Sequence, residues 1–282
     1  MITCKSSREI EKMRRSARVT VHALEKLRGA VAPGITTAEI DAYAEELIRG
    51  AGGVPAFLGY HGFTGSVCTS VNDEIVHGIP GKRRLQEGDL FKIDIGSSVD
   101  GWYSDMACTI AVGHISADAQ RLLDVTAEAL VRGIAQVRPG VHVSDIGHAV
   151  QSYVEGEGYT VVRALVGHGI GTSLHEDPPV PNYGRQGAGP LLKPGMVLAI
   201  EPMVNAGTWK VRTKADRWTV VTADGRLSSH FEHTVAVTAH GYDVLTLNDD
   251  QPLHQAFHRL GQHEKGEKLG ATETPGRLQA FG

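Results

Sequence analysis

Two carboxylates flank a predicted hairpin turn, where they could hold cations. Residues 90–109 contain Asp100-Gly101 between two β-rich runs, and Asp-Gly in that setting is the strongest short-range signal for a β-hairpin. If these two residues form the turn, Gly96 lies opposite Asp105, and Asp94 shares the face of Gly96. The Cβ atoms of Asp94 and Asp105 would then lie about 7–8 Å apart, which suits a pair of cations about 3.5–4 Å apart.

The alternative is that both carboxylates are solvated on an exposed face of the hairpin. Two buried like charges side by side are costly unless one carboxyl is protonated or a cation lies between them. The rest of the chain favours the cation, because further carboxylates recur at related positions and two histidines lie shortly before one of them.

An internal repeat supplies two more carboxylates. Residues 33–34 and 139–140 are both Pro-Gly, an offset of 106, and with an offset of 107 residues 88–94 align with 195–201, so that Asp94 matches Glu201. Asp105 and Glu232 each begin a β-rich run. A duplicated α+β unit predicts two halves related by a pseudo-twofold axis, with the sheets joined centrally and the helices outside. Four anions meeting there would require positive charge between them.

A glycine-dense stretch, residues 166–175, carries His168 and His175 shortly before the strand that ends at Glu201. The glycines predict a loop whose backbone passes close to a ligand. A lone histidine is more often structural than functional. These two differ because only a short Pro-rich connection separates them from a carboxylate strand, so we take both as candidate site residues.

Four helices are expected to frame these segments. Residues 6–9 and 36–39 are capping boxes, which predict helices ending near residue 28 and near residues 50–53. Two further helices are predicted over residues 116–137 and 144–157, and strands are predicted over residues 67–71 and 74–77. We expect one catalytic domain over residues 1–250 and a loosely ordered tail over residues 251–282, where His254 and His258 have helical ligand spacing but no third ligand nearby.

Composition indicates an ordinary soluble protein, with 41% hydrophobic and 21% charged residues. The net charge of −4 gives no general reason to expect nucleic acid or an anionic membrane as a partner. The three cysteines form no CxxC pair, and the N-terminus contains neither a signal peptide nor a membrane span. These features favour a reducing, cytoplasmic location.

The candidate residues resemble a known family. Asp94, Asp105, His168, Glu201 and Glu232, at spacings of 11, 63, 33 and 31, resemble the five metal ligands of the type I methionine aminopeptidases, which have the pita-bread fold. Residues 72–80 resemble that family's segment bearing a substrate-contacting histidine, and residues 58–63 resemble its pocket segment. The resemblance covers residues 10–248. The short intervals between ligands and the short leader favour the bacterial type I form over type II and eukaryotic forms.

The resemblance implies an α+β pita-bread fold and a dinuclear metal-dependent peptide hydrolase. Such an enzyme removes the initiator methionine from nascent polypeptides, preferably before a small second residue, with a metal-activated hydroxide. Asp94 would bind one metal through both oxygens, Asp105 and Glu232 would bridge, and His168 with Glu201 would complete the second metal. This mainly oxygen ligand set is compatible with Co, Mn, Fe or Zn, and suits Mn, Fe or Co better than a thiolate-rich zinc site would.

The resemblance also implies roles around the metals. Glu201 would accept the proton of the water and pass it to the leaving nitrogen. His175 would hydrogen-bond the carbonyl oxygen as it gains charge, and His77 would hold the substrate backbone or the leaving side. The pocket for the methionine side chain would be formed by Phe57, Tyr60, Phe63, Cys68 and Trp218, although ordinary core packing explains any single one of these aromatics as well. Phe57 stands where bacterial relatives often have Cys, which implies a narrower pocket.

The expected partner is the N-terminal methionine of nascent polypeptides, bound by a monomer without specific nucleic acid or membrane. The basic residues Lys12, Arg14, Arg15 and Arg18 leave a transient ribosome contact open. Two alternatives remain. A proline-directed aminopeptidase or prolidase shares the ligands but normally has a large N-terminal domain. A binding protein of the same fold that lost catalysis, such as one that binds nucleic acid or ribosomes, normally has a broken ligand set.

Overall fold

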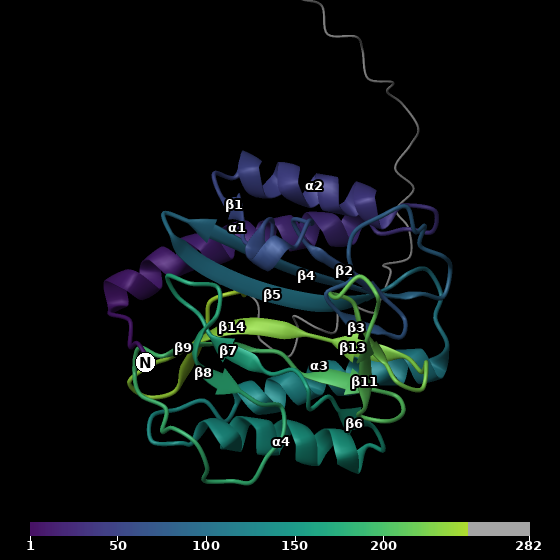
Figure 1. Cartoon of the computed structure of the whole chain (residues 1–282). Helices are drawn as coiled ribbons and strands as arrows, with labels where there is room; N and C mark the ends of the chain where they lie inside the picture. The colour runs from purple at the N-terminus through teal and green to yellow at the C-terminus, as the bar shows by residue number, and fades with distance from the viewer. Residues whose placement is uncertain (248–282) are drawn as a thin grey trace, which may run out of the picture.

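The computed structural model describes residues 1–247, and a curved nine-stranded sheet lies at its centre. Figure 1 shows α1 (Ser7–Ala30) and α2 (Thr37–Gly50) on one side of this sheet, and α3 (Ala117–Ile134) and α4 (Val143–Gly156) on the opposite side. The expected α+β fold is therefore confirmed. The predicted tail and its two histidines lie outside the described residues, and the single-domain assignment stays a prediction.

The strands are short except for one hairpin. The first half contains β1 (Val54–Pro55), a 3-10 turn η1 (Tyr60–Gly62), β2 (Cys68–Val71), β3 (Glu74–Val76), β4 (Leu90–Val99) and β5 (Trp102–Ala111). The second half contains β6 (Thr160–Val161), β7 (Gly167–Gly169), β8 (Glu176–Val180), β9 (Val197–Ile200), β10 (Met203–Asn205), β11 (Val211–Thr213), β12 (Val220–Thr222), β13 (Ser228–His230), β14 (Glu232–Val237) and β15 (Tyr242–Val244).

The predicted helix starts follow from their caps. The side chains of Ser6 and Thr36 accept the backbone N–H of Glu9 and Glu39, and each glutamate caps in return. The predicted ends are less accurate: α3 ends at Ile134 instead of residue 137, and α4 begins one residue before the predicted Ser144. None of the helices in the described part is both long and apolar enough to cross a membrane.

The hairpin has the predicted register. Gly96 pairs with Asp105 and Val99 with Trp102. Asp100 and Gly101 have φ of 52° and 76°, as a two-residue turn that matches the twist of the strands requires. A local turn signal therefore determined which residues of this hairpin face each other.

The two halves repeat the same local structure. Helices α2 and α4 have bounds that differ by 106 at both ends, and β4 and β9 begin 107 residues apart. Gly34 donates its backbone N–H to the Leu85 carbonyl oxygen, and at the matching positions Gly140 donates to Leu192. The same hydrogen bond at matched offsets supports the predicted duplication.

The halves join at the centre of the sheet. The strand order β1-β4-β5-β14-β9-β7-β8 places β5 of the first half beside β14 of the second. Thr234 fastens this joint, because its hydroxyl accepts the N–H of Asp105 at 3.0 Å and donates to the Asp105 carbonyl oxygen at 2.8 Å. The candidate carboxylates of both halves consequently lie on neighbouring strands.

Candidate metal centre and substrate pocket

Three of the predicted carboxylates come together on adjacent strands. In the sheet register Ala107 of β5 is the partner of Asp94 on β4 and of Glu232 on β14. Asp105 lies two residues before Ala107 and therefore on the same face. The small side chain of Ala107, only 1% exposed, leaves space between the carboxylates.

His168 and Glu201 approach from the second half. His168 pairs with Ala199 of β9, and Glu201 directly follows that strand. The expectation that His168 lies in a loop is wrong in this respect: it is the central residue of the short strand β7. Its glycines allow close strand packing, since a Cβ on Gly169 would lie 2.2 Å from the Asp177 carbonyl oxygen. Asn182 holds the backbone beyond β9 by donating to the Glu201 carbonyl oxygen at 2.9 Å.

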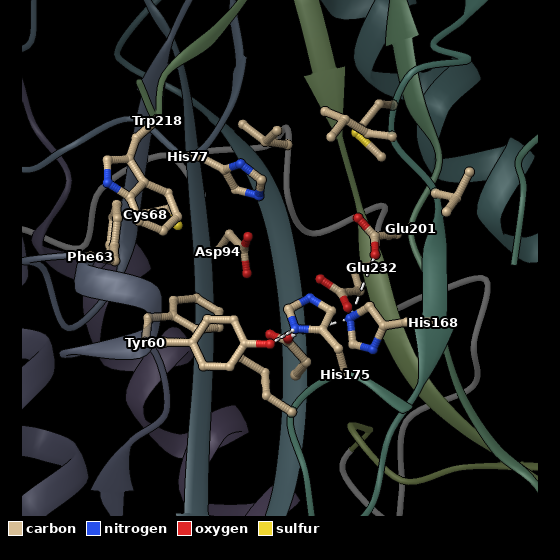
Figure 2. Close-up of a pocket in the computed structure, with 17 residues that line it drawn as sticks. Tyr60, Phe63, Cys68, His77, Asp94, His168, His175, Glu201, Trp218 and Glu232 are labelled. Atoms are coloured by element: carbon tan, nitrogen blue, oxygen red, sulfur yellow. Dashed lines mark hydrogen bonds and ion pairs between the residues drawn. The ribbon is translucent and has the colours of Figure 1, made fainter. Parts of the chain in front are cut away.

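The side chains form one acidic cluster around an imidazole (Figure 2). Asp105, His168 and Glu232 each offer a ligand atom within 4.8 Å of the others. The Nε2 atom of His168 lies 3.9 Å from Asp105 Oδ2 and 3.7 Å from Glu201 Oε1. Nδ1 of the same ring lies 2.8 Å from the Gly169 carbonyl oxygen, which requires a proton on Nδ1 and leaves the Nε2 lone pair for a metal.

Burial alters the ionisation of the carboxylates. It raises the pKa of Asp94 to about 7, although a hydrogen bond with Asp105 acts in the opposite direction. Burial, followed by the charges of Asp94 and Glu201, raises the pKa of Asp105 well above its ordinary value. The pKa values of Glu201 and Glu232 are also well above the ordinary value, mainly because of burial and then because of neighbouring carboxylates.

The cluster has the properties of a cation site. Asp94 Oδ1 and Glu232 Oε1 are buried without a hydrogen-bond partner, and such oxygens are normally satisfied. Burial lowers the pKa of His168 to about 3, so its imidazole is neutral and able to act as a ligand. Divalent cations would neutralise the carboxylates and satisfy the unpaired oxygens at once. The donor set of carboxylates and one imidazole therefore fits divalent metal ions.

His77 is held in a strained backbone conformation beside this cluster. The predicted strand over residues 74–77 ends at Val76, because His77 has a φ of 59°, which is uncommon for residues other than glycine. The next residue is anchored on both sides: Gly78 accepts the Thr69 N–H at 2.8 Å and donates to Ser70 Oγ at 3.0 Å. The tight connection thereby turns His77 toward the pocket.

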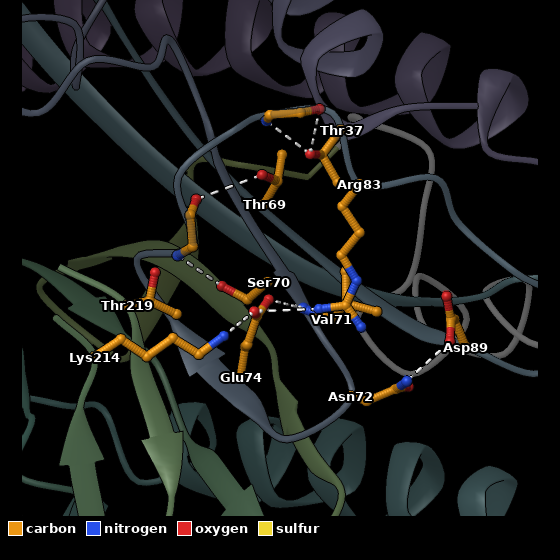
Figure 3. Close-up of polar contacts among 12 residues, drawn as sticks. Thr37, Thr69, Ser70, Val71, Asn72, Glu74, Arg83, Asp89, Lys214 and Thr219 are labelled. Carbon is orange, nitrogen blue, oxygen red and sulfur yellow. Dashed lines mark hydrogen bonds and ion pairs between the residues drawn. The ribbon is translucent and has the colours of Figure 1, made fainter. Parts of the chain in front are cut away.

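A polar cluster supports the β2–β3 turn that precedes His77 (Figure 3). Glu74 accepts the Val71 N–H at 2.7 Å and also binds Arg83 Nη1 at 3.2 Å and Lys214 Nζ at 2.5 Å. Asn72 donates to Asp89 at 2.8 Å. These contacts connect the turn to the β11–β12 hairpin of the second half, so the position of His77 depends on both halves.

A pocket of about 220 Å³ opens over the cluster. Phe63 and Trp218 form one wall, with ring centroids 5.1 Å apart in an edge-to-face arrangement. Tyr60 also lines the pocket, with its hydroxyl oxygen 2.6 Å from His175 Nδ1. All twelve predicted site residues line this pocket, together with five that the sequence did not indicate: Val76, Leu165, Val166, Leu174 and Met203.

His230 is a contact of the cluster that sequence reasoning missed. It is 1% exposed, its Nε2 lies 3.7 Å from Glu201 Oε2, and neither ring nitrogen has a hydrogen-bond partner. Its position two residues before Glu232 was the available signal, because residues two apart in a strand share a face. The change from β13 to β14 at Phe231 hides this pattern in the sequence.

Comparisons with known proteins identify the family of this chain. The model of metallopeptidase family M24 matches residues 11–239. Methionine aminopeptidase 1 of Bacillus subtilis is 53% identical over 246 residues, which are 87% of this chain and 99% of that protein. A methionine aminopeptidase of Clostridium acetobutylicum is 49% identical over 248 residues, 88% of this chain and 99% of that protein.

Solved structures agree. The methionine aminopeptidase of Rickettsia prowazekii has a TM-score of 0.87 and 41% identity, covering 88% of this chain and all of that one. The prolidase of Pyrococcus furiosus, with a TM-score of 0.73 and 24% identity over 87% of this chain and 66% of that one, shares the fold. The family match, the identity to these relatives and the shared fold together show that the chain belongs to metallopeptidase family M24.

Proposed function

We propose that this chain is a methionine aminopeptidase that removes the initiator methionine from nascent polypeptides, preferably before a small second residue. The observation that carries the proposal is the meeting of buried carboxylates and one neutral imidazole at the base of a pocket with aromatic walls. The names of the relatives in Bacillus and Clostridium support it.

The proposed metal centre holds two divalent ions, which could be Co, Mn, Fe or Zn. Asp94, Asp105, His168, Glu201 and Glu232 would provide the ligands. The unpaired buried oxygens of Asp94 and Glu232 support this assignment. Bound ions would lower the pKa of a water molecule toward neutrality and polarise the scissile carbonyl.

Glu201 is the proposed proton carrier. Its carboxylate lies beside His168 and His230, at 3.7 Å from each Nε2 atom. A carboxylate that reaches the attacking water can accept its proton and deliver it to the leaving nitrogen. His175 would donate a hydrogen bond to the carbonyl oxygen as negative charge develops, and His77 would contact the substrate backbone on the leaving side.

The proposed methionine pocket is formed by Phe57, Tyr60, Phe63, Cys68 and Trp218. Favourable contacts between sulfur and aromatic rings, worth about 0.3–1.5 kcal/mol each, suit an unbranched thioether. Phe57 packs on the hairpin, since a Cβ on Gly96 would lie 3.0 Å from its ring. Its bulk at this position supports a narrow pocket that excludes branched side chains.

We also propose that the enzyme is a cytoplasmic monomer. A transient ribosome contact through α1 has weaker support, because three of its four basic side chains are already paired: Arg14 with Asp243, Arg15 with Asp100, and Arg18 with Glu11.

Peptide cleavage by the purified, metal-loaded protein tests the proposal. We expect release of methionine from Met-Ala peptides and no cleavage of N-acetyl-Met-Ala peptides, because the reaction requires a free α-amine. Cleavage of Ala-Pro peptides with Met-Ala peptides left intact would instead indicate a proline-directed peptidase. Elemental analysis separates the second alternative, since a binding protein without catalysis should hold no stoichiometric divalent metal.

A further inference from the structure

A short hydrogen bond joins the two halves at the edge of the pocket. Tyr60 belongs to η1 in the first half, and His175 follows β7 in the second. The tyrosine hydroxyl oxygen lies 2.6 Å from His175 Nδ1, and the two ring centroids are 5.2 Å apart. Figure 2 shows the hydroxyl directed at this nitrogen and the other ring nitrogen turned away from Tyr60.

The chemistry of the two groups sets the direction of this hydrogen bond. A neutral imidazole has one nitrogen that donates and one that accepts. In the neutral ring, Nδ1 of His175 can therefore either accept a hydrogen bond from the Tyr60 hydroxyl or donate one to it. A phenol is a better donor than an imidazole N–H, and an imidazole nitrogen is a better acceptor than a phenol oxygen. The Tyr60 hydroxyl therefore donates to Nδ1, which leaves the His175 proton on Nε2.

The backbone on both sides of this hydrogen bond is independently held. Glu176 Oε1 accepts the N–H groups of Thr172 and Ser173 at 2.8 and 3.2 Å, and its Oε2 binds the buried Lys5 Nζ at 2.7 Å. On the other side, the Tyr60 N–H donates to the Phe57 carbonyl oxygen and the Tyr60 carbonyl oxygen accepts the Phe63 N–H, both at 2.9 Å. With both backbones fixed, the hydroxyl decides how the His175 ring is oriented and protonated.

The neighbouring histidine shows the opposite arrangement. The rings of His168 and His175 have centroids 4.1 Å apart. His168 donates its Nδ1 proton to the Gly169 carbonyl oxygen, so its Nε2 carries a lone pair. His175 accepts a hydrogen bond at Nδ1 from the Tyr60 hydroxyl, so its own proton is on Nε2. An acceptor beside one ring and a donor beside the other thus produce one metal-binding nitrogen and one hydrogen-bond donor.

We propose that Tyr60 is a positioning residue, whose hydroxyl holds His175 in the Nε2–H tautomer and directs that N–H toward the substrate carbonyl oxygen. The inference rests on the proposed function, because it is the scissile carbonyl that gives this N–H its task. It goes beyond the role of Tyr60 as a pocket wall, since a wall requires the ring and not the hydroxyl.

Nitrogen NMR of the full chain tests the tautomer without relying on activity. The protein would be loaded with diamagnetic Zn²⁺ and labelled with ¹⁵N-histidine, and the His175 signals would be assigned by their loss in His175→Gln. We expect the Nε2–H pattern in the wild type and a mixture of tautomers in Tyr60→Phe. Tyr103→Phe is the matched control, because among the described residues the Tyr103 hydroxyl forms no hydrogen bond with His175 and lies close enough to Tyr60 to interact with it, and it should retain the wild-type pattern. An unchanged pattern in Tyr60→Phe would overturn the proposal.

Steady-state kinetics on a Met-Ala peptide provide the second measurement. Outer partners that orient metal-binding imidazoles are typically worth about 10–100-fold in activity. By analogy, we expect Tyr60→Phe to lower kcat by about that factor with little change in KM. A raised KM with unchanged kcat would reduce Tyr60 to a pocket wall and overturn the proposal. If the wild type cleaves no methionyl peptide, the proposed function fails, whereas the NMR result still decides the tautomer.

Discussion

The two halves of the molecule present matching carboxylates on different local structures. In the first half, Asp94 and Asp105 lie on the ten-residue strands β4 and β5, joined by a two-residue turn. In the second half, Glu232 lies 31 positions after Glu201, and the segment between them, which we call the insertion, forms the strands β10 to β13. The symmetric part of the fold therefore supplies the acidic cluster, and the insertion makes the halves unequal.

The insertion builds the substrate side of the pocket. It carries Met203 and Trp218, both of which line the cavity. Its strand β12 pairs with β3 of the first half, with Val220 opposite Val76, the residue before His77. Duplication accounts for a metal site, whereas the departure from symmetry gives the site a pocket on one side.

A second asymmetry lies at the N-terminus. The Lys5 backbone N–H bonds to the Gly195 carbonyl oxygen at 2.6 Å. Gly88, the first-half equivalent of Gly195, has only the His114 carbonyl oxygen near the position of a Cβ, at 3.7 Å. The N-terminal segment thus covers the turn before β9 and leaves the turn before β4 open.

Replacing the equivalent carboxylates should have the largest effect and shows whether the halves are chemically equal. We expect Glu201→Gln to lower kcat by about 10²–10⁴-fold, because the variant loses a proposed ligand and the proposed proton carrier together. Asp94→Asn should also lose activity but regain part of it at high divalent metal concentration, because it loses only a proposed ligand. Methionine release measured against metal concentration distinguishes the two, and equal rescue of both variants would contradict the assigned role of Glu201.

Removing His175 should have the next largest effect. His175→Ala loses the proposed donor to the developing oxyanion, so we expect kcat to fall by about 10²-fold or more. KM should change little if the interaction forms mainly in the transition state. An effect confined to KM would place His175 in ground-state binding instead.

The matched glycines test the N-terminal asymmetry. Gly88 and Gly195 have φ of 91° and 90°, so alanine is strained at both, by roughly 1–2 kcal/mol. A Cβ on Gly195 would also lie 2.4 Å from the Lys5 carbonyl oxygen, an overlap that we expect to add about 1–3 kcal/mol. Urea denaturation of the metal-free variants measures the difference between their free energies of unfolding. Equal destabilisation would show that the N-terminal segment moves away from the new side chain at no cost in free energy.

The smallest predicted effect is the pH dependence of stability without metal. Burial raises the pKa of Glu201 in the folded protein above its ordinary value. The protonated carboxyl therefore contributes to the free energy of unfolding. This contribution is complete at pH values below the pKa of the unfolded state, and it is lost as pH rises through the pKa of the folded state. After chelator treatment, Glu201→Gln should have a higher melting temperature than wild type at pH 8, and the difference in melting temperature should be smaller at pH 5. A difference in melting temperature that does not depend on pH would show that the pKa of Glu201 is not raised in the folded protein.

Local signals explain which parts of the site could be predicted. The Asp-Gly turn determined the register that pairs Gly96 with Asp105, because a two-residue turn leaves no freedom in the count. Predicting Glu201 as a site residue required the internal repeat. Glu201 could be aligned with Asp94 because the strands before both residues begin after equivalent turns. His230 was missed because a break between two strands conceals its face.

The sequence by itself determined the helix caps, the central hairpin, the duplication and the set of candidate site residues, because each depends on neighbours in the chain or on a repeated order of elements. Only the tertiary structure decided the positive φ of His77, the contact of His230 with Glu201, and the meeting of Tyr60 with His175 across 115 residues. These features depend on distances between segments that pack together only once the two halves close around a common sheet, and no local pattern encodes such distances.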